Sequence, residues 1–260
     1  MPSLNIFIYK LYGAKTEWII TFVITLSKNG LLAAAFTIAI IWSLSQAYAA
    51  ESVPAFSMPV SQKVIWLDAG HGGFDPGKVA GKIDEKDINL EIALKLQYFL
   101  EMGGATVFMS RLEDEALSST KQGDMYQRRV LANASEADIF VSIHQNSFPQ
   151  ASVHGAQVFY FNTSDNSRKL AGHIQQQIKE FVGTNQRMQA KPNRNYYVLR
   201  QTIMPAVIVE CGFLTNYADR SKLLQEDYQE RIAWGIYLGI IQYFEELSSP
   251  QDKSTPSADI

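Results

Sequence analysis

Five short apolar runs, rich in valine, isoleucine and phenylalanine, are spaced along the chain from residue 63 onward. β-Branched and aromatic residues favour strands, and runs of this length are typical of strands buried in a sheet. Between the runs, leucine, isoleucine and alanine recur every three or four positions, which predicts helices with one apolar face. We therefore expect strands at 63–67, 105–109, 138–143, 156–161 and 206–210, and helices at 88–102, 122–135, 167–182 and 228–247.

This alternation of strands and helices predicts an α/β fold, a single domain with a central mixed, mostly parallel sheet flanked by helices on both faces. We expect the domain to span residues 63–247, after a linker at 51–62. The tail, residues 248–260, is polar and is expected to be disordered.

The first 50 residues differ in kind from the rest. Lys28 precedes an apolar run at 31–44, and the small-x-small pattern that signal peptidase recognises follows at 47–49. The run is about as long as the core of a signal peptide and short for a membrane span. A second apolar run at 17–26 makes an uncleaved membrane anchor the alternative. Both interpretations predict an exported domain, secreted or anchored, with membrane contact only through this segment.

The charge of the chain and its cysteine content indicate which partners and which means of stabilisation to expect. The chain carries 23 basic and 26 acidic side chains, and three lysines and one glutamate of these lie in the first 50 residues. The remainder therefore has a net charge of about −5, whereas nucleic acid binding requires a basic surface, so no nucleic acid partner is expected. The single cysteine, Cys211, cannot form an internal disulfide, so the exported domain must be stabilised by its core.

Polar side chains follow three of the predicted strands. His71 comes just after the first in "VIWLDAGHGG", His144 ends another in "DIFVSIHQNS", and Glu210 ends a third in "PAVIVECGF". Functional sites in open α/β sheets gather at the carboxyl ends of the strands, so these side chains meet if their strands are parallel neighbours. Asp84 or Glu85, at the start of the first helix, would lie near the same edge.

Two neutral imidazoles and a carboxylate are a common ligand set for zinc in hydrolases, with the fourth position left to water. The glycines around His71 allow a sharp turn, and Asp68 could accept a hydrogen bond from a ligand imidazole. Simpler interpretations exist: a structural histidine, a phosphate-binding glycine loop, and a Glu85 that favours the helix N-terminus. Glu210 is harder to explain in this way, because a buried carboxylate costs several kcal/mol unless it is paired, metal-bound or hydrated.

Residues 63–244 contain four motifs, "LDAGHGGFDPG", "EKDINLEIA", "ADIFVSIHQNS" and "PAVIVECGFLTN", in this order. Together they resemble the zinc-dependent N-acetylmuramoyl-L-alanine amidases of bacterial cell-wall remodelling. Within that family the chain looks most like the germination-specific amidases of spore formers, because of its "QRRVLANASEADIF" segment, its short export segment and its lack of cell-wall-binding repeats.

The resemblance implies a role for each motif. His71, Glu85 and His144 would bind Zn²⁺, and Glu210 would be the catalytic carboxylate, first as general base and then as general acid. The implied reaction is hydrolysis of the amide bond between N-acetylmuramic acid and L-alanine, in spore cortex peptidoglycan before muramic-δ-lactam formation. The implied partners are glycan strands with stem peptides, and an accessory protein is a further candidate.

A glycan that bears stem peptides requires a long, open groove. Arginine, glutamine and asparagine side chains could hold the carboxylates and amides of such a substrate, and aromatic rings could stack on its sugars. The candidates for polar contacts are Arg111, Arg128, Arg129, Arg200, Gln145 and Asn146, and those for stacking are Tyr196, Tyr197 and Phe213.

The chain departs from the family pattern at two positions. Cys211 stands where many relatives have threonine or valine, and Gln145 where alanine is common. A cysteine beside the site makes a Cys–His hydrolase the rival chemistry, although the adjacent Glu210 disfavours a thiolate. A zinc exopeptidase of similar scaffold and a non-catalytic cell-wall-binding module are the alternative functions.

Overall fold

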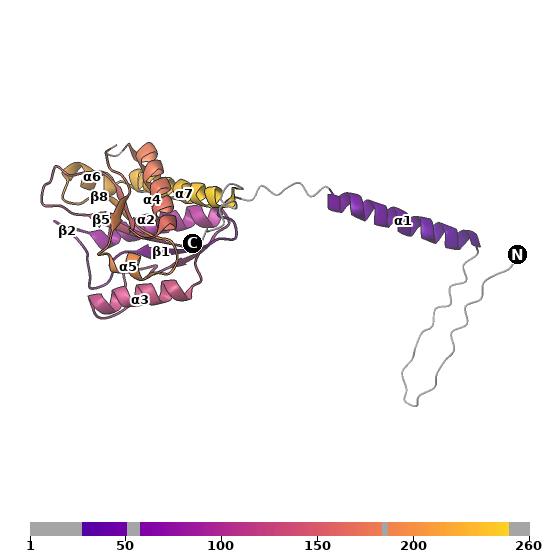
Figure 1. Ribbon diagram of the computed structural model, residues 1–260, viewed down its shortest axis with the longest axis horizontal. Helices are drawn as coiled ribbons and strands as arrows, with labels where there is room; N and C mark the ends of the chain where they lie inside the picture. Colours follow the sequence, from indigo (N-terminus) through magenta and orange to yellow (C-terminus); the bar gives the residue numbers. More distant parts are fainter. Residues whose placement is uncertain (1–27, 51–57, 184–186, 250–260) are drawn as a thin grey trace, which may run out of the picture. The chain divides into compact units, whose positions relative to one another are not determined.

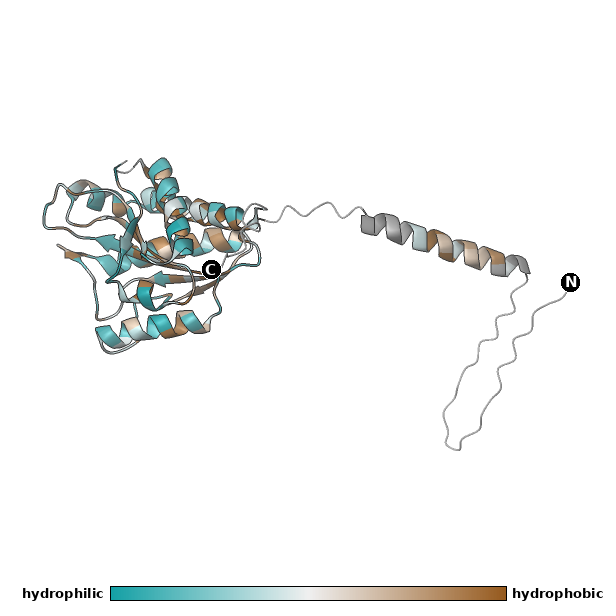
Figure 2. Cartoon of the chain, viewed as in Figure 1, coloured by the Kyte–Doolittle hydropathy of each residue, from teal (hydrophilic) through white to brown (hydrophobic). Residues whose placement is uncertain are grey.

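The structure, a computed structural model, describes residues 28–50, 58–183 and 187–249. It divides into two compact units, Met1–Phe56 and Ser57–Ile260. Within the first unit, α1 (Lys28–Ala50) is a helix whose described middle is coloured mostly hydrophobic in Figure 2. Among the residues described, no helix combines the length and the apolarity needed to cross a bilayer. The apolar run at 17–26, most of the expected linker and nearly all of the expected tail lie outside the described residues.

The second unit is built around a six-stranded sheet with the strand order β4-β1-β5-β8-β6-β7. The neighbours β4, β1, β5 and β8 are all parallel, whereas β6 runs antiparallel to β8 and parallel to β7. The sheet is therefore mixed and mostly parallel, and the five predicted strands all belong to it. The strands are β1 (Val64–Ala69), β4 (Thr106–Met109), β5 (Ile139–Asn146), β6 (Gln157–Phe161), β7 (Lys191–Asn193) and β8 (Ala206–Phe213), with a separate hairpin of β2 (Val79–Ala80) and β3 (Ile83–Asp84).

Helices cover both faces of this sheet, as expected (Figure 1). One core lies under α2, α4 and α7, and a smaller core lies under α3 and α5. The four predicted helices are present, and α5 and α6 are additional. The helices are α2 (Glu85–Met102), α3 (Lys121–Ala134), α4 (Asp165–Val182), α5 (Tyr197–Gln201), α6 (Tyr217–Leu223) and α7 (Glu226–Ser248).

Strand alternation assigns each polar residue of the sheet to one of these faces. In β8, Val207, Val209 and Cys211 belong to the larger core, whereas Ala206 and Ile208 belong to the smaller one. The next residue of even number, Glu210, therefore points to the α3 and α5 side. The same parity in β1 and β5 puts Asp68, Ser142 and His144 on that side, at the carboxyl edge of three parallel neighbours.

Candidate metal centre

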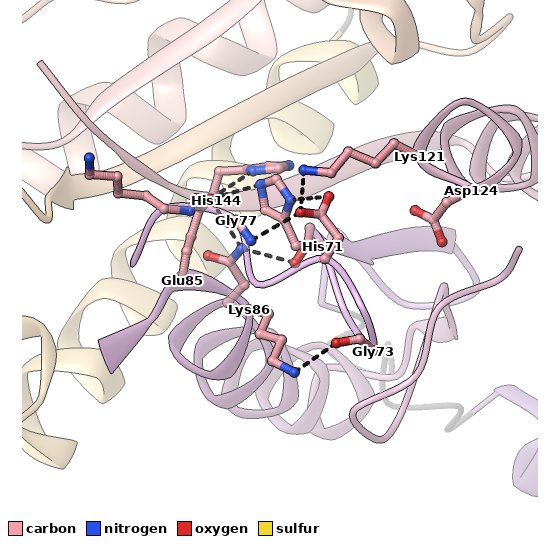
Figure 3. A network of polar contacts seen from close by, with 12 residues as sticks. His71, Gly73, Gly77, Glu85, Lys86, Lys121, Asp124 and His144 are labelled. Carbon is pink, nitrogen blue, oxygen red and sulfur yellow. Dashed lines mark hydrogen bonds and ion pairs between the residues drawn. The ribbon is translucent and has the colours of Figure 1, made fainter. Parts of the chain in front are cut away.

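Three side chains that lie far apart in the sequence meet at the carboxyl edge of the sheet. His71 follows β1, His144 lies in β5, and Glu85 is the first residue of α2. One potential ligand atom from each lies within 4.8 Å of the other two. Glu85 Oε1 accepts a hydrogen bond from His144 Nδ1 at 3.0 Å and pairs with His71 Nε2 at 3.3 Å. Figure 3 shows the three side chains pointing toward one another, so this site could hold a metal ion.

A carboxylate and a lysine fix the ring of His71 from its other side. His71 Nδ1 donates to Asp75 Oδ2 at 2.9 Å, which leaves Nε2 facing Glu85. Asp75 Oδ1 in turn pairs with Lys121 Nζ of α3 at 2.7 Å. Such an outer carboxylate sets the tautomer of an imidazole and raises its basicity as a ligand. Neither Asp75 nor Lys121 was predicted, although Asp75 lies in the same glycine-rich stretch, four residues after His71.

Contacts within this cluster shift the pKa values of Glu85 and His71. Burial raises the pKa of Glu85, but hydrogen bonds and charge from His144 and His71 outweigh burial and hold the pKa far below its usual range. Burial lowers the pKa of His71, yet contacts with the Glu85 and Asp75 carboxylates raise it to about 9. A bound cation would oppose the shift of the His71 pKa, because a metal ion replaces the protons on its ligands.

Glu210 lies beside this cluster, opposite His144 in the β5–β8 register. Its side chain is buried, and burial raises its pKa to about 7. The Tyr196 hydroxyl donates to Oε1 at 3.4 Å, while Oε2 has no hydrogen-bond partner among the described residues. A carboxyl group with a pKa near neutrality and one oxygen without a partner is suited to accept a proton and release it again.

A cavity of about 260 Å³ opens beside these groups, between α3 and α5. Tyr196 and Tyr197 line it, as the stacking hypothesis requires, whereas Phe213 is buried and does not. Lys121, whose side chain is exposed, also lines the cavity. Figure 3 shows this side chain reaching toward His71. The lining residues are Asp68, Gly70, His71, Asp75, Lys121, Asp124, Met125, Arg128, His144, Tyr196, Tyr197, Val198, Ile208 and Glu210.

The role predicted for Asp68 was wrong. Its carboxylate accepts hydrogen bonds from Arg128 Nη1 at 2.5 Å and from Ser142 Oγ at 2.6 Å, and none from a ligand imidazole. The reason is geometric: Asp68 is the last but one residue of β1 and points down onto α3, whereas the ring of His71 turns toward α2. Asp75 makes the contact with an imidazole that was predicted for Asp68.

Of the residues predicted to make polar contacts with substrate, only Arg128 lines the cavity. Arg111 is buried and donates only to main-chain carbonyls, and Arg128 is buried in hydrogen bonds with Asp68, Asp124 and the main chain. Gln145 points into the opposite face, where its amide donates to Asn89.

Three more of these candidates lie outside the cavity wall. Arg129 lies over the ring of Tyr126, at 4.7 Å from its centroid. Arg200 is exposed on α5. The side-chain oxygen of Asn146 accepts a hydrogen bond from the main-chain N–H of the next residue, Ser147. None of the three lines the cavity.

Cys211 does not have the environment of a nucleophile. It follows Glu210 in β8 and therefore points to the opposite face, where it is fully buried in the larger core. Burial raises the pKa of the thiol above its usual range, so the reactive thiolate is disfavoured. The geometry thus favours the His71, Glu85, His144 and Glu210 cluster over a Cys–His arrangement.

Comparisons with known proteins agree with this geometry. Residues 65–242 match the family model described as N-acetylmuramoyl-L-alanine amidase. The germination-specific N-acetylmuramoyl-L-alanine amidase of Bacillus subtilis is 37% identical over 210 residues, which cover 78% of this chain and 88% of that protein.

Solved structures give the same result. The CwlD amidase from Clostridioides difficile, in complex with the GerS lipoprotein, is 40% identical with a TM-score of 0.68, covering 71% of this chain and all of that one. An N-acetylmuramoyl-L-alanine amidase from Clostridium difficile 630 is 34% identical with a TM-score of 0.65, covering 71% of this chain and 98% of that one.

Proposed function

The chain belongs to the N-acetylmuramoyl-L-alanine amidase family, and from this premise we propose that it is a zinc-dependent member that acts on spore cortex peptidoglycan. Family membership makes it an enzyme that cleaves the bond between N-acetylmuramic acid and L-alanine. It also argues against the two alternatives, a zinc exopeptidase and a non-catalytic binding module.

The observation that carries the zinc proposal is the ligand geometry. Two ligands bound to zinc at 2.0–2.2 Å in a tetrahedral arrangement are roughly 3.3 Å apart. The contacts of Glu85 Oε1 with His144 and His71, at 3.0 and 3.3 Å, are close to that edge length. The donor set also fits, because two imidazoles and one carboxylate leave a fourth position for water in catalytic zinc sites.

In this proposal His71, Glu85 and His144 hold the metal ion, and Glu210 moves the proton. Bound zinc would supply Lewis acidity toward the scissile carbonyl and make water a better nucleophile. Glu210 accepts the proton of the attacking water at Oε2 and delivers it to the leaving amine of L-alanine, which is a poor leaving group until it is protonated. Tyr196 holds the other oxygen of Glu210 in place.

The spore cortex as substrate is supported by the name of the Bacillus subtilis relative, which is germination-specific. In this role the enzyme would strip stem peptides from muramic acid and so prepare it for δ-lactam formation. Lys121, which lines the cavity, is a candidate for contact with a stem-peptide carboxylate. An accessory lipoprotein is part of the proposal as well, because the Clostridioides difficile relative was solved in complex with one.

The domain arrangement and the location of the protein are also proposals. Residues 1–50 would be a signal peptide or membrane anchor, 51–62 a linker, 63–247 the catalytic domain and 248–260 a disordered tail. The protein would then be exported, which is where its peptidoglycan substrate lies.

Mass spectrometry of digested peptidoglycan tests the proposal. The full-length chain is incubated with purified cortex peptidoglycan and with vegetative peptidoglycan, each with zinc and with a chelator. We expect peptides with a free L-alanine amine to be released from cortex peptidoglycan, and the release to stop on chelation. Release that persists in chelator would contradict the zinc proposal, and equal release from both substrates would contradict the cortex preference.

A further inference from the structure

Three successive main-chain carbonyls at the metal site, those of Ala69, Gly70 and His71, accept hydrogen bonds from two buried arginines. Arg111 donates from Nε to Ala69 O at 2.9 Å and from Nη2 to Gly70 O at 3.2 Å. Arg128 donates from Nη1 to Ala69 O at 2.8 Å and from Nη2 to His71 O at 2.6 Å. The two guanidinium groups, which we call the carbonyl clamp, therefore hold the whole turn that carries His71.

The burial of these two arginines is not explained by a gain in the stability of the fold. Arg111 is 2% exposed, and its four hydrogen bonds all go to main-chain carbonyls, the other two being those of Lys86 and Glu113. Removing a guanidinium from water costs several kcal/mol, and carbonyl oxygens compensate for this less than a carboxylate does. A buried guanidinium has several N–H donors in one rigid plane, and when these bind main-chain carbonyls they impose a defined geometry on that backbone.

His71 has a backbone conformation that must be imposed. Its φ is +63°, in the left-handed region that a non-glycine residue enters at a cost of about 1–2 kcal/mol. The conformation of a residue is set by the two rigid peptide planes that flank it. Arg111 and Asn89 hold the plane before His71 through Gly70 O, and Arg128 holds the plane after it through His71 O.

The clamp also connects two of the three metal-binding side chains. Arg111 Nη2 donates to Lys86 O at 2.6 Å, in the first turn of α2, and Glu85 begins that helix. One side chain thus fixes the His71 turn relative to the residue next to Glu85. Arg128, itself a residue of α3, connects the same turn to that helix, and Asp124, one helical turn earlier, accepts a hydrogen bond from its Nε at 2.6 Å.

We propose that Arg111 and Arg128 are positioning residues, which hold His71 in its left-handed conformation and so keep its ring in register with Glu85 for metal binding. This inference rests on the proposed zinc site. It replaces the role in substrate binding that the sequence suggested for both arginines, because both guanidinium groups are buried and hydrogen-bonded to the main chain, including that of Arg128, which lines the cavity.

Arg111→Lys is the sharpest test, because lysine keeps the positive charge but lacks the planar guanidinium that donates several hydrogen bonds at once. In the full-length chain we expect it to weaken Zn²⁺ binding about 10–100-fold, as measured by chelator competition, which is the range for loss of an outer-shell partner. The absorption spectrum of bound Co²⁺ should change as well, because it reports the geometry of the ligands. Arg128→Met, which also removes the positively charged partner of Asp68, should weaken zinc binding at least as strongly.

A matched control separates positioning from general destabilisation. Gly239→Ala disturbs the contact of α7 with α4, since its Cβ would meet Ile174 Cα at 2.5 Å, and it does not touch the site. If Gly239→Ala loses as much thermal stability as Arg111→Lys, it should still bind zinc with the affinity of the wild type. If it loses zinc in proportion to its stability, or if Arg111→Lys binds zinc within twofold of the wild type with an unchanged Co²⁺ spectrum, the positioning role is wrong. Failure of the wild type itself to bind zinc would instead overturn the proposed zinc site and this inference with it.

Discussion

Gly70 lies directly beneath the ring of His144, so a single methyl group there should displace a proposed zinc ligand. A Cβ at position 70 would lie 2.2 Å from His144 Cε1 and 2.3 Å from Nε2. Carbon atoms in van der Waals contact are about 3.5–4.0 Å apart, so one of the two groups must move by roughly 1.3 Å. The backbone of Gly70 is not left-handed, so alanine adds no strain of its own.

The imidazole should move rather than the main chain. Gly70 N donates to Ile143 O at 3.1 Å, and Gly70 O accepts from both Asn89 and Arg111. Zinc sites tolerate deviations of only about 0.2 Å in ligand distance, so a shift of roughly 1.3 Å removes His144 from coordination. We expect Gly70→Ala to weaken zinc binding by at least about 100-fold, beyond the effect of losing an outer-shell partner.

Chelator competition on the folded variant measures this effect, with the thermal midpoint recorded on the same sample. Gly172→Ala is the matched control, because it makes the same substitution in α4 where a Cβ would meet nothing within 4 Å. The control should keep wild-type zinc affinity and gain up to about 1 kcal/mol of helix stability. If Gly70→Ala binds zinc with an affinity within threefold of the wild type, the prediction is wrong. The main chain at residue 70 would then have moved instead of the ring of His144.

Three further predictions concern catalysis and stability. Glu210→Gln should keep zinc and lose about 10²–10⁴-fold in turnover, the usual contribution of a general base, and loss of metal from this variant would mean that Glu210 is a ligand. Gly239→Ala should lower the free energy of unfolding by about 1–3 kcal/mol in urea titrations, because its Cβ has no space against α4; an unchanged midpoint would refute this. Asp68 has a pKa lowered to about 2, with burial opposed by the charge of Arg128 and a hydrogen bond from Ser142. The stability from this lowered pKa, roughly 2 kcal/mol, is present above pH 3.8 and lost as the pH falls toward 2, so Asp68→Asn should flatten the pH dependence of unfolding in that range.

Most of the fold could be predicted from the sequence because its main elements are long and strongly patterned. The five apolar runs became strands of one sheet, and the helical periodicity of segments such as 228–247 was long enough to be unambiguous. The elements that were not predicted are short, such as α5 (five residues), β7 (three residues) and the β2–β3 hairpin. Segments of this length have too few positions to show a period, and their structure depends on tertiary contacts.

The convergence of His71, His144 and Glu210 could be inferred because strand ends are marked in the sequence. It required only that β1, β5 and β8 be parallel neighbours, which they are. The surroundings of the site could not be inferred in the same way. Nothing in the sequence distinguishes Arg111 and Arg128 from arginines at the surface. Only the three-dimensional structure shows that they are buried against a turn.

The misassignment of Asp68 shows where the sequence argument reaches its limit. Within a strand, parity fixes the direction of a side chain, and Asp68 shares the parity of Trp66, which belongs to the core on the α3 side. Beyond Ala69 parity no longer applies, because His71, Gly72 and Gly73 have positive φ and the chain reverses in the antiparallel bridge between Gly72 and Asp75. The partner of the His71 ring must then come from the loop that this reversal creates, and Asp75, four residues on, is the carboxylate in reach at 2.9 Å. Asp68, inside the strand, therefore pairs with Arg128 of α3, whereas Asp75, after the turn, contacts the ring of the proposed metal ligand His71.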